Sequence, residues 1–145
     1  MLTIDTATAA DRADLAARMV QADRDELQAA GVGMDCLNVP AQALRWDGQL
    51  VCLFGVMPMP AEEGAGIPWM LCTDTLATVP RRAMARISAE VVGRWRHGHH
   101  RLINLVHRHN DQALRFLRWL GFSISDTPTG PGDAFLVFTW ERPNV

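Results

Sequence analysis

The sequence predicts a single α+β domain over residues 1–145, with a mixed, mostly antiparallel sheet of about seven strands and helices on both faces. Three observations support this fold class. Segments with the apolar patterns of strands lie in both halves of the chain. Tight-turn signals join neighbouring segments into antiparallel hairpins. An amphipathic helical segment separates residues 67–72 from residues 101–106, which predicts a crossover between two strands.

The first elements are a short strand, residues 3–7, and two helices. Thr8 and Asp11 fit a capping box at the start of the first helix. The second helix covers residues 22–30, and the glycines of the sequence GVG end it.

A hairpin follows within residues 42–58, where two strand-like runs are joined by Asp47-Gly48. Asp-Gly between such runs is a strong hairpin signal. Residues 59–66 form a second turn, and a third strand lies within residues 67–74.

The second half contains two further helices and the remaining strands. Pro80 fits the first turn of a long helix. Residues 101–106 are nearly all apolar, which predicts a strand that is buried on both faces. Asn110 caps the last helix, and a hairpin within residues 123–140 completes the sheet. The predicted buried stripes of the two helices are Met84, Ile87, Val91 and Trp95, and Ala113, Phe116, Leu117 and Leu120.

Charge is distributed unevenly along the chain. Residues 81–118 contain nine arginines and two acidic residues, whereas the remainder contains five arginines and 14 acidic residues, for a net charge of −2. A basic segment of this kind favours a partner with phosphate or carboxylate groups. The alternative is an arginine-rich helix face that is simply solvated, with arginines turned away from the apolar stripe.

Composition narrows the functional classes. No apolar run approaches the ~18–20 residues that cross a bilayer, and the N-terminus has no signal-peptide pattern, so we expect no membrane association. The three cysteines have no metal or redox spacing and favour a reducing, cytoplasmic setting. The histidines of residues 97–109 lack the ligands that would complete a zinc site, so we expect no metal. Trp95 and Trp119 occupy helix positions typical of the core or its edge, so we expect no specific nucleic acid.

The element order, the opening TIDTATAADRADLA and the stretch HNDQALRFLRWLGF together resemble the GNAT superfamily of acetyl-CoA-dependent N-acetyltransferases. The combination of PWMLCTD, LINLVHRHN and RFLRWLGF is most similar to a phage and prophage family that includes an internal virion protein of short-tailed bacteriophages. The resemblance implies a GNAT-like fold, acetyl-CoA as cofactor if the protein is active, and coenzyme A or phage structural proteins as partners. It also implies a location in the cytoplasm of a bacterial host or in the virion.

In GNAT enzymes a glycine-rich loop at the start of the central helix binds the coenzyme pyrophosphate through backbone N–H groups. The matching stretch TLATVPRRAMARIS has no glycine. Arg81 and Arg82 could contact the phosphates in its place, or they are ordinary surface residues. The resemblance also implies coenzyme contacts for Thr73 and Asn110.

The general base of such a reaction would lie at the ends of the two strands that the crossover joins. Asp74 is the best-placed carboxylate and His107 is the alternative. Each has a simpler interpretation, Asp74 as a turn residue and His107 as an exposed strand end. Asn104 lies inside an apolar run, so its amide either pairs within the protein or faces a polar cleft and the coenzyme.

The general acid is missing from the pattern. The resemblance places a tyrosine at the position of Leu117, and the chain contains no tyrosine. We therefore expect a GNAT-fold phage or prophage protein with a degenerate catalytic apparatus, acting through binding or as a virion component. The alternative is an active acetyl-CoA-dependent N-acyltransferase that acts on a small amine or a protein amine.

Overall fold

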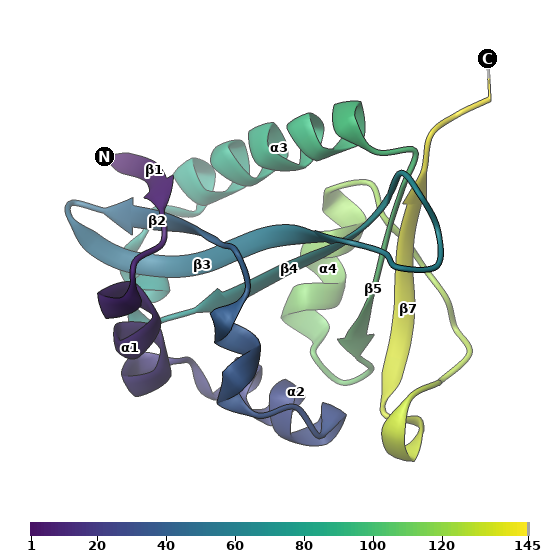
Figure 1. Ribbon diagram of the computed structural model, residues 1–145, viewed down its shortest axis with the longest axis horizontal. Coiled ribbons are helices and arrows are strands. Elements are labelled where there is room, and N and C mark those ends of the chain that lie inside the picture. The colour runs from purple at the N-terminus through teal and green to yellow at the C-terminus, as the bar shows by residue number, and fades with distance from the viewer. Residues whose placement is uncertain (145) are drawn as a thin grey trace. The chain divides into compact units, whose positions relative to one another are not determined.

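Seven strands form one sheet in the computed structural model, which describes residues 1–144 (Figure 1). Their order is β1-β2-β3-β4-β5-β7-β6. β4 and β5 pair in parallel, whereas β1–β2, β2–β3, β5–β7 and β6–β7 are antiparallel, so the predicted α+β class with a mixed, mostly antiparallel sheet is confirmed. The strands are β1 (Leu2–Thr6), β2 (Gln42–Trp46), β3 (Gln49–Pro58), β4 (Ala65–Cys72), β5 (Arg101–His107), β6 (Ser123–Ile124) and β7 (Phe135–Glu141). The helices are α1 (Ala9–Arg18), α2 (Gln21–Ala30), α3 (Arg81–Gly98) and α4 (Asp111–Trp119), with short 3-10 helices η1 (Met34–Asn38), η2 (Asp74–Thr78) and η3 (Pro131–Asp133).

The chain divides into two compact units, and each is described by itself. Unit 1 comprises Met1–Gly55 and Trp69–Met84, and unit 2 comprises Val56–Pro68 with the chain from Ala85 onward. Each unit contains a hydrophobic cluster of its own. One domain over the whole chain therefore stays a prediction.

The helix cap and the hairpin turn of unit 1 have the structures that the sequence predicts. The Thr8 hydroxyl accepts a hydrogen bond from the backbone N–H of Asp11, and the Asp11 carboxylate accepts one from the N–H of Thr8. The residues of the Asp47-Gly48 turn have φ angles of 48° and 83°, as a tight hairpin turn requires. One hydrophobic cluster in the core of this unit consists of Leu15, Met19, Leu37, Ala43, Leu50 and Leu53.

In unit 2, β5 pairs with β7 along its full length, and the two strands lie side by side in Figure 1. Leu102 and Val106 are buried, but Leu105 is 40% exposed. The prediction that this strand is buried on both faces is therefore wrong. Alternate side chains of a strand point to opposite faces, and only the face of Leu102 and Val106 packs in the core of unit 2.

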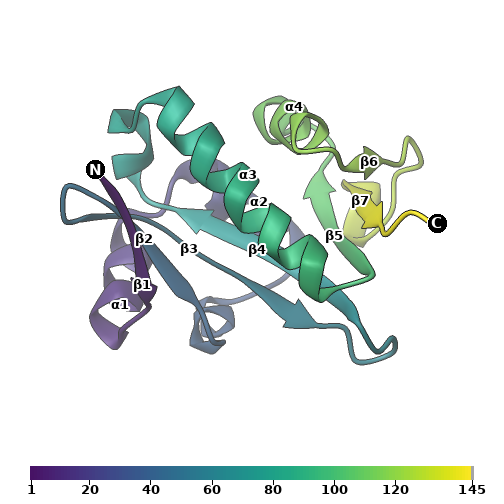
Figure 2. The same cartoon turned by 90° about the horizontal axis from the view of Figure 1, so that it is seen from above.

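α4 packs beside β6 in the same unit (Figure 2). Of its predicted stripe, Ala113, Leu117 and Leu120 pack against the core of unit 2 and are partly buried. Leu114, which the prediction left out, is the buried residue of this helix, and Phe116 stacks on Trp119 with ring centroids 6.1 Å apart. Trp119 is 60% exposed, so its assignment to the core edge is wrong.

Arg96 also departs from the expected solvent-facing arrangement. Its guanidinium lies 5.5 Å from the ring centroid of Phe122 and 5.3 Å from that of Trp140. Its Nη2 donates to the carbonyl of Leu120. Aromatic rings and a carbonyl thus accommodate this arginine inside the unit, and burial lowers its pKa.

Among the described residues, no helix combines the length and the apolar character needed to span a bilayer.

A bidentate ion pair fixes the start of α1 on the sheet of unit 1. Arg45 Nη1 and Nη2 donate to Asp11 Oδ1 and Oδ2 at 3.0 and 2.8 Å, and the Asp11 side chain is only 9% exposed. The hydrogen bond from Arg45 outweighs the burial of the carboxyl and keeps the pKa of Asp11 below its usual value. The exposed Asp5 is a second, longer partner of Arg45, at 3.2 Å.

We predict that Arg45→Met lowers the free energy of unfolding by about 3 kcal/mol at pH 7, because it leaves a buried carboxylate without its cation. The lowered pKa of Asp11 stabilises the folded state above about pH 4, and this contribution is lost as the pH falls through the folded-state pKa. The difference between wild type and variant should therefore shrink in acid. Urea unfolding at pH 7 and pH 3.5 measures it, with Asp5→Asn as the near-neutral control. An equal loss at both pH values would contradict the prediction.

Candidate coenzyme and acceptor site

The end of β4 is held by hydrogen bonds in which Thr73 takes the central part. Its hydroxyl donates to the carbonyl of Leu50 at 2.5 Å and accepts the N–H of Thr75 at 3.2 Å. Its own N–H donates to the carbonyl of Val51 at 2.8 Å. Thr73 is fully buried, so its hydroxyl serves the fold of unit 1, and its contact with a coenzyme stays a prediction.

Asp74 follows at the first position of η2 and is paired with an arginine. Arg18 Nη1 lies 2.5 Å from Asp74 Oδ1 and also donates to the hydroxyl of Thr75 at 2.9 Å. The same guanidinium binds Asp14 through Nε and Nη2 at 2.7 and 2.9 Å, which lowers the pKa of Asp14. The guanidinium of Arg18 therefore occupies one oxygen of the Asp74 carboxylate. This geometry disfavours Asp74 as the base, and that role stays a prediction.

Arg81 and Arg82 are exposed at the start of α3, which follows η2. The Met84 N–H donates to the carbonyl of Pro80, so Pro80 lies just before the helix rather than in its first turn. The N–H groups of residues 81–83 precede this bond, at the position where a helix leaves backbone donors without an intrahelical partner. Two exposed arginines are thus the first two residues of the helix whose start offers backbone N–H groups, and both belong to unit 1.

Asp23 is a residue that the sequence analysis missed. It lies in the first turn of α2, and its Oδ2 accepts the backbone N–H of Cys72, the last residue of β4, at 2.7 Å. The carbonyl of Cys72 accepts the N–H of Val20 at 2.9 Å, and Met19 forms a bridge with Thr73. The connection between α1 and α2 is therefore paired with the end of β4, and this pairing brings Asp23 there.

Burial raises the pKa of Asp23 to about 6, and the nearby Glu26 carboxylate adds to the increase. The N–H of Cys72 opposes it. A rise of about two units corresponds to roughly 3 kcal/mol, which exceeds the ~0.3–1 kcal/mol that a helix start gives to an acidic side chain. Nothing in the sequence QADRDELQ distinguishes Asp23 from Asp25, because tertiary packing produces the difference.

Comparison with solved structures identifies the fold, although no protein-family model matches the chain and no curated protein matches it. An acetyltransferase of the GNAT family from Streptococcus pneumoniae is 14% identical with a TM-score of 0.62, over 99% of this chain and 100% of that chain. A ribosomal-protein-alanine N-acetyltransferase from Brucella melitensis is 18% identical with a TM-score of 0.66, over 96% and 99%. A Salmonella typhimurium protein described as an acetyltransferase, with its cofactor acetyl-CoA, is 15% identical with a TM-score of 0.63, over 99% and 95%.

The chain has the GNAT acetyltransferase fold. Within this fold its departures are local. η2 and Pro80 occupy the connection where the GNAT resemblance places a glycine-rich loop. Leu117, where it places a tyrosine, packs against the hydrophobic cluster of unit 2.

The remaining predicted GNAT site residues lie in unit 2. Asn104 Nδ2 donates to the carbonyl of Pro68 at 2.8 Å, and its Oδ1 accepts the N–H of Leu105 at 2.7 Å. Of the two interpretations of this amide, pairing within the protein is therefore the one seen. This side-chain bond to β4 lies just beyond residues 65 and 66, where the backbones of β4 and β5 pair, and Pro68 itself has no N–H to donate to a ladder.

His107 ends β5, and its ring packs on Phe135 with centroids 5.6 Å apart. Its Nδ1 accepts the N–H of His109 at 3.2 Å, which places the proton of a neutral imidazole on Nε2. Neither nitrogen is then a ready proton acceptor, so this geometry disfavours His107 as the base. Asn110 caps α4 through the N–H of Ala113 at 3.3 Å, and its coenzyme contact stays a prediction.

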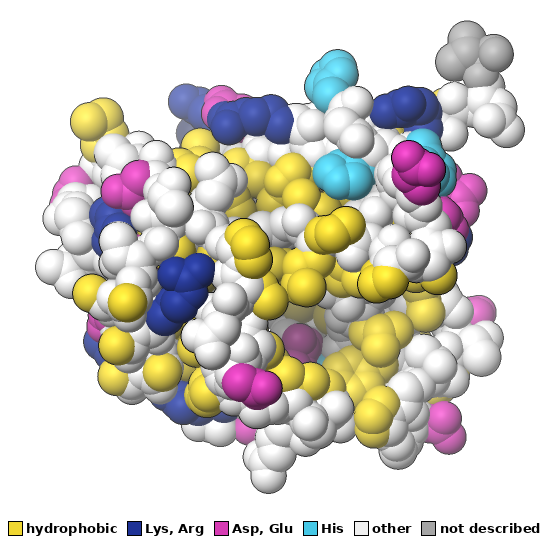
Figure 3. Space-filling model, in the orientation of Figure 1, with side chains coloured by type: hydrophobic (Ala, Val, Ile, Leu, Met, Phe, Trp, Pro, Cys, Tyr) yellow, Lys and Arg dark blue, Asp and Glu magenta, His cyan; other side chains and the backbone are white. Residues whose placement is uncertain are grey.

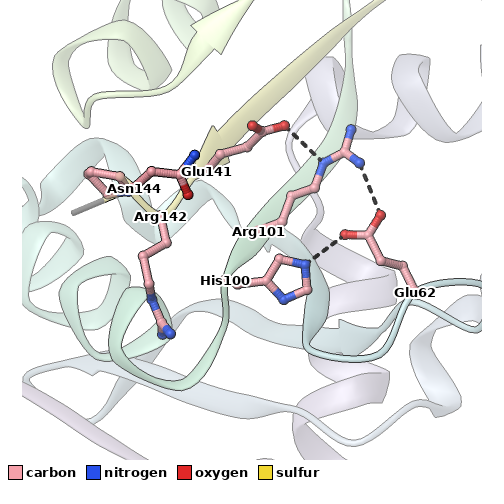
Figure 4. Close-up of a pocket in the computed structure, with 7 residues that line it drawn as sticks. Glu62, His100, Arg101, Glu141, Arg142 and Asn144 are labelled. Carbon is pink, nitrogen blue, oxygen red and sulfur yellow. Dashed lines mark hydrogen bonds and ion pairs between the residues drawn. The ribbon is translucent and has the colours of Figure 1, made fainter.

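Unit 2 also has an open, polar pocket of about 440 Å³ near the end of β7 (Figure 4). Glu62 lies 3.0 Å from His100 Nε2 and 3.1 Å from Arg101 Nη1. Arg101 Nε is 3.6 Å from Glu141. Arg142 turns away to the carbonyls of residues 96, 97 and 99. The charged side chains that line this pocket are thus bonded to one another or, for Arg142, to backbone carbonyls. Among the described residues the pocket therefore shows no charged group left for a ligand.

Figure 3 shows arginine and histidine side chains gathered along the edge formed by α3. No group of three or more His, Cys, Asp or Glu side chains suited to a metal ion occurs within residues 1–144. The arginines at positions 81, 82, 86 and 94 of this helix are exposed, as its sequence indicates, whereas Arg96 packs on aromatic rings.

We predict that Asp23→Asn raises the free energy of unfolding by about 1–3 kcal/mol at pH 7.5. The raised pKa means that ionisation of Asp23 costs the folded state stability as the pH rises from about 4 to 6, and Asn avoids this cost. Below pH 4 the two proteins should be equally stable. Thermal unfolding at pH 4 and pH 7.5 measures the effect, with the exposed Asp25→Asn as the matched control. A variant that is less stable at pH 7.5 would show that the charge of Asp23 supports the fold.

Proposed function

We propose that this protein is an N-acyltransferase that takes its acyl group from an acyl-coenzyme A, with acetyl-CoA as the simplest donor. The observation that carries the proposal is the exposed pair Arg81 and Arg82 at the open start of α3. This pair follows the end of β4 in a chain with the GNAT fold over nearly its full length.

The hydrogen-bond donors at the start of α3 fit a pyrophosphate, although they differ from the backbone donors of a glycine-rich loop. Guanidinium groups bind phosphate oxygens as forks, and free N–H groups at a helix start favour anions. The absence of glycine removes close backbone approach, so charge takes the larger share of binding. When bound, the coenzyme supplies an acyl group activated as a thioester.

The acceptor class follows from the chemistry of the same unit. An amine needs a group that removes its proton, and the end of β4 carries two carboxylates, those of Asp23 and Asp74. The absence of a tyrosine removes general-acid help worth ~10²–10⁴-fold, so we expect a slow enzyme in which solvent protonates the leaving thiolate.

The proposal is tested by titrating acetyl-CoA into the protein by calorimetry at low salt. Arg81→Ala/Arg82→Ala should weaken binding ~10²–10⁴-fold, because the variant loses two charged hydrogen bonds and each is worth roughly 1.5–3 kcal/mol. Arg86→Ala/Arg94→Ala removes two exposed charges from the same helix and should leave the affinity nearly unchanged. Equal effects of the two double variants would show that the arginines attract the coenzyme only through net charge.

A second candidate is a GNAT-fold binding protein without turnover, and the observations that favour it are the missing glycines and the packing of Leu117 against the hydrophobic cluster of unit 2. The phage resemblance of PWMLCTD, LINLVHRHN and RFLRWLGF makes a virion or prophage role its natural form, with phage structural proteins as partners. Absence of acetyl-CoA binding in the same titration would favour this candidate over the enzyme.

A further inference from the structure

Resting on the proposed function, we propose that Asp23 is the catalytic base that takes the proton of the acceptor amine at the end of β4. The sequence analysis assigned this role to Asp74 or His107. The geometry of these two residues and of Asp23 favours Asp23. Asp23 and Asp74 both lie in unit 1, so these two carboxylates can be compared directly.

The first argument is the state of the carboxylate oxygens. Oδ2 of Asp23 is held by the N–H of Cys72, which fixes the side chain, and Oδ1 has no hydrogen-bond partner among the described residues. Asp74 also has one oxygen bound, but it is exposed and its partner is the cationic guanidinium of Arg18, at 2.5 Å, rather than a neutral N–H. A base needs an oxygen that is oriented and unpaired, and Asp23 has one.

The second argument is the surroundings of Asp23. The side chain is partly buried, and the charged neighbour that acts on it is Glu26, a like charge on the next turn of α2. The buried thiol of Cys72 lies on the strand side, and its hydrogen bond with Cys52 and its burial raise its pKa. Among the described residues no cation is paired with Asp23, so its carboxylate keeps its affinity for a proton.

The third argument is that the charge exceeds what the fold requires. The N–H of Cys72 needs one acceptor, which an amide oxygen would provide without the cost of burying an ion. A charged group kept at a cost to stability is characteristic of functional sites.

The proposed step balances as follows. An alkylammonium acceptor gives one proton to Oδ1 of Asp23, and the free amine nitrogen forms a bond to the thioester carbonyl carbon. The C–S bond breaks, the thiolate leaves, and the second N–H proton reaches it through solvent. Asp23 returns its proton to water, so the products are an amide, the free thiol of coenzyme A and one proton.

The test uses the full chain, acetyl-CoA and a panel of primary amines (alkylamines, arylalkylamines and peptides with a free N-terminus), with thiol release as the rate. With the best acceptor, Asp23→Asn should lower kcat ~10²–10⁴-fold and leave the affinity for acetyl-CoA unchanged by calorimetry. The rise of kcat/KM with pH through about 6 should disappear. Asp25→Asn is the control for charge on α2, and Asp74→Asn tests the competing carboxylate.

Each outcome of this test supports or overturns the proposed role of Asp23. A large loss in Asp74→Asn with little loss in Asp23→Asn would overturn the proposal and leave the acyltransferase function standing. Binding of acetyl-CoA without turnover of any amine, or no binding at all, would remove the proposed function and this inference with it. Carbon-13 NMR of labelled aspartate carboxyls provides a readout independent of turnover. An Asp23 resonance that titrates near pH 4 would overturn the proposal, and one that titrates near pH 6 would support it.

Discussion

The hydrogen bonds at the end of β4 are the constraint on which the candidate site of unit 1 depends. The backbone of Cys72 is bonded to Asp23 through its N–H and to Val20 through its carbonyl. The buried hydroxyl of Thr73 closes the strand onto the carbonyl of Leu50 in the next strand. These bonds join β3, β4 and the start of α2, so the carboxylates near them lie on rigid elements rather than on a free loop. Rigid support of this kind is what a catalytic geometry needs.

Much of the fold could be predicted because its signals are local. The capping box of Thr8 and Asp11 and the Asp47-Gly48 turn depend on residues a few positions apart, and both formed as predicted. The errors concern which side chains are buried, since burial depends on partners distant in sequence. Leu105 lies in an apolar run typical of the core, yet its side chain is exposed. Arg96 lies among arginines that face solvent, yet its guanidinium packs on the ring of Trp140.

The candidate site was predictable only in part for the same reason. A strand end and a helix start lie where the sequence predicts them, at the end of β4 and the start of α3, and their part in a site stays a prediction. The roles of individual residues could not be predicted. Thr73 uses its hydroxyl within the fold, and Asp74 is bound by Arg18, a residue 56 positions away. Asp23 becomes distinctive only when α2 meets β4, and the pKa of an aspartate reflects that surrounding rather than its sequence neighbours.

The departures from the GNAT pattern differ in how strongly each would slow acyl transfer. The missing tyrosine would have protonated a leaving thiolate, and a thiol has a pKa near 8.5, so a thiolate leaves without much help around neutral pH. An alkylammonium has a pKa of about 10.4 and does not attack until it loses a proton. Loss of the acid therefore slows the reaction less than loss of a base would. Leu117, where the resemblance places the acid, packs against the hydrophobic cluster of unit 2, while the Asp23 carboxylate accepts the N–H of Cys72 at the end of β4. If the proposed function holds, this asymmetry predicts a slow acyltransferase rather than an inactive one.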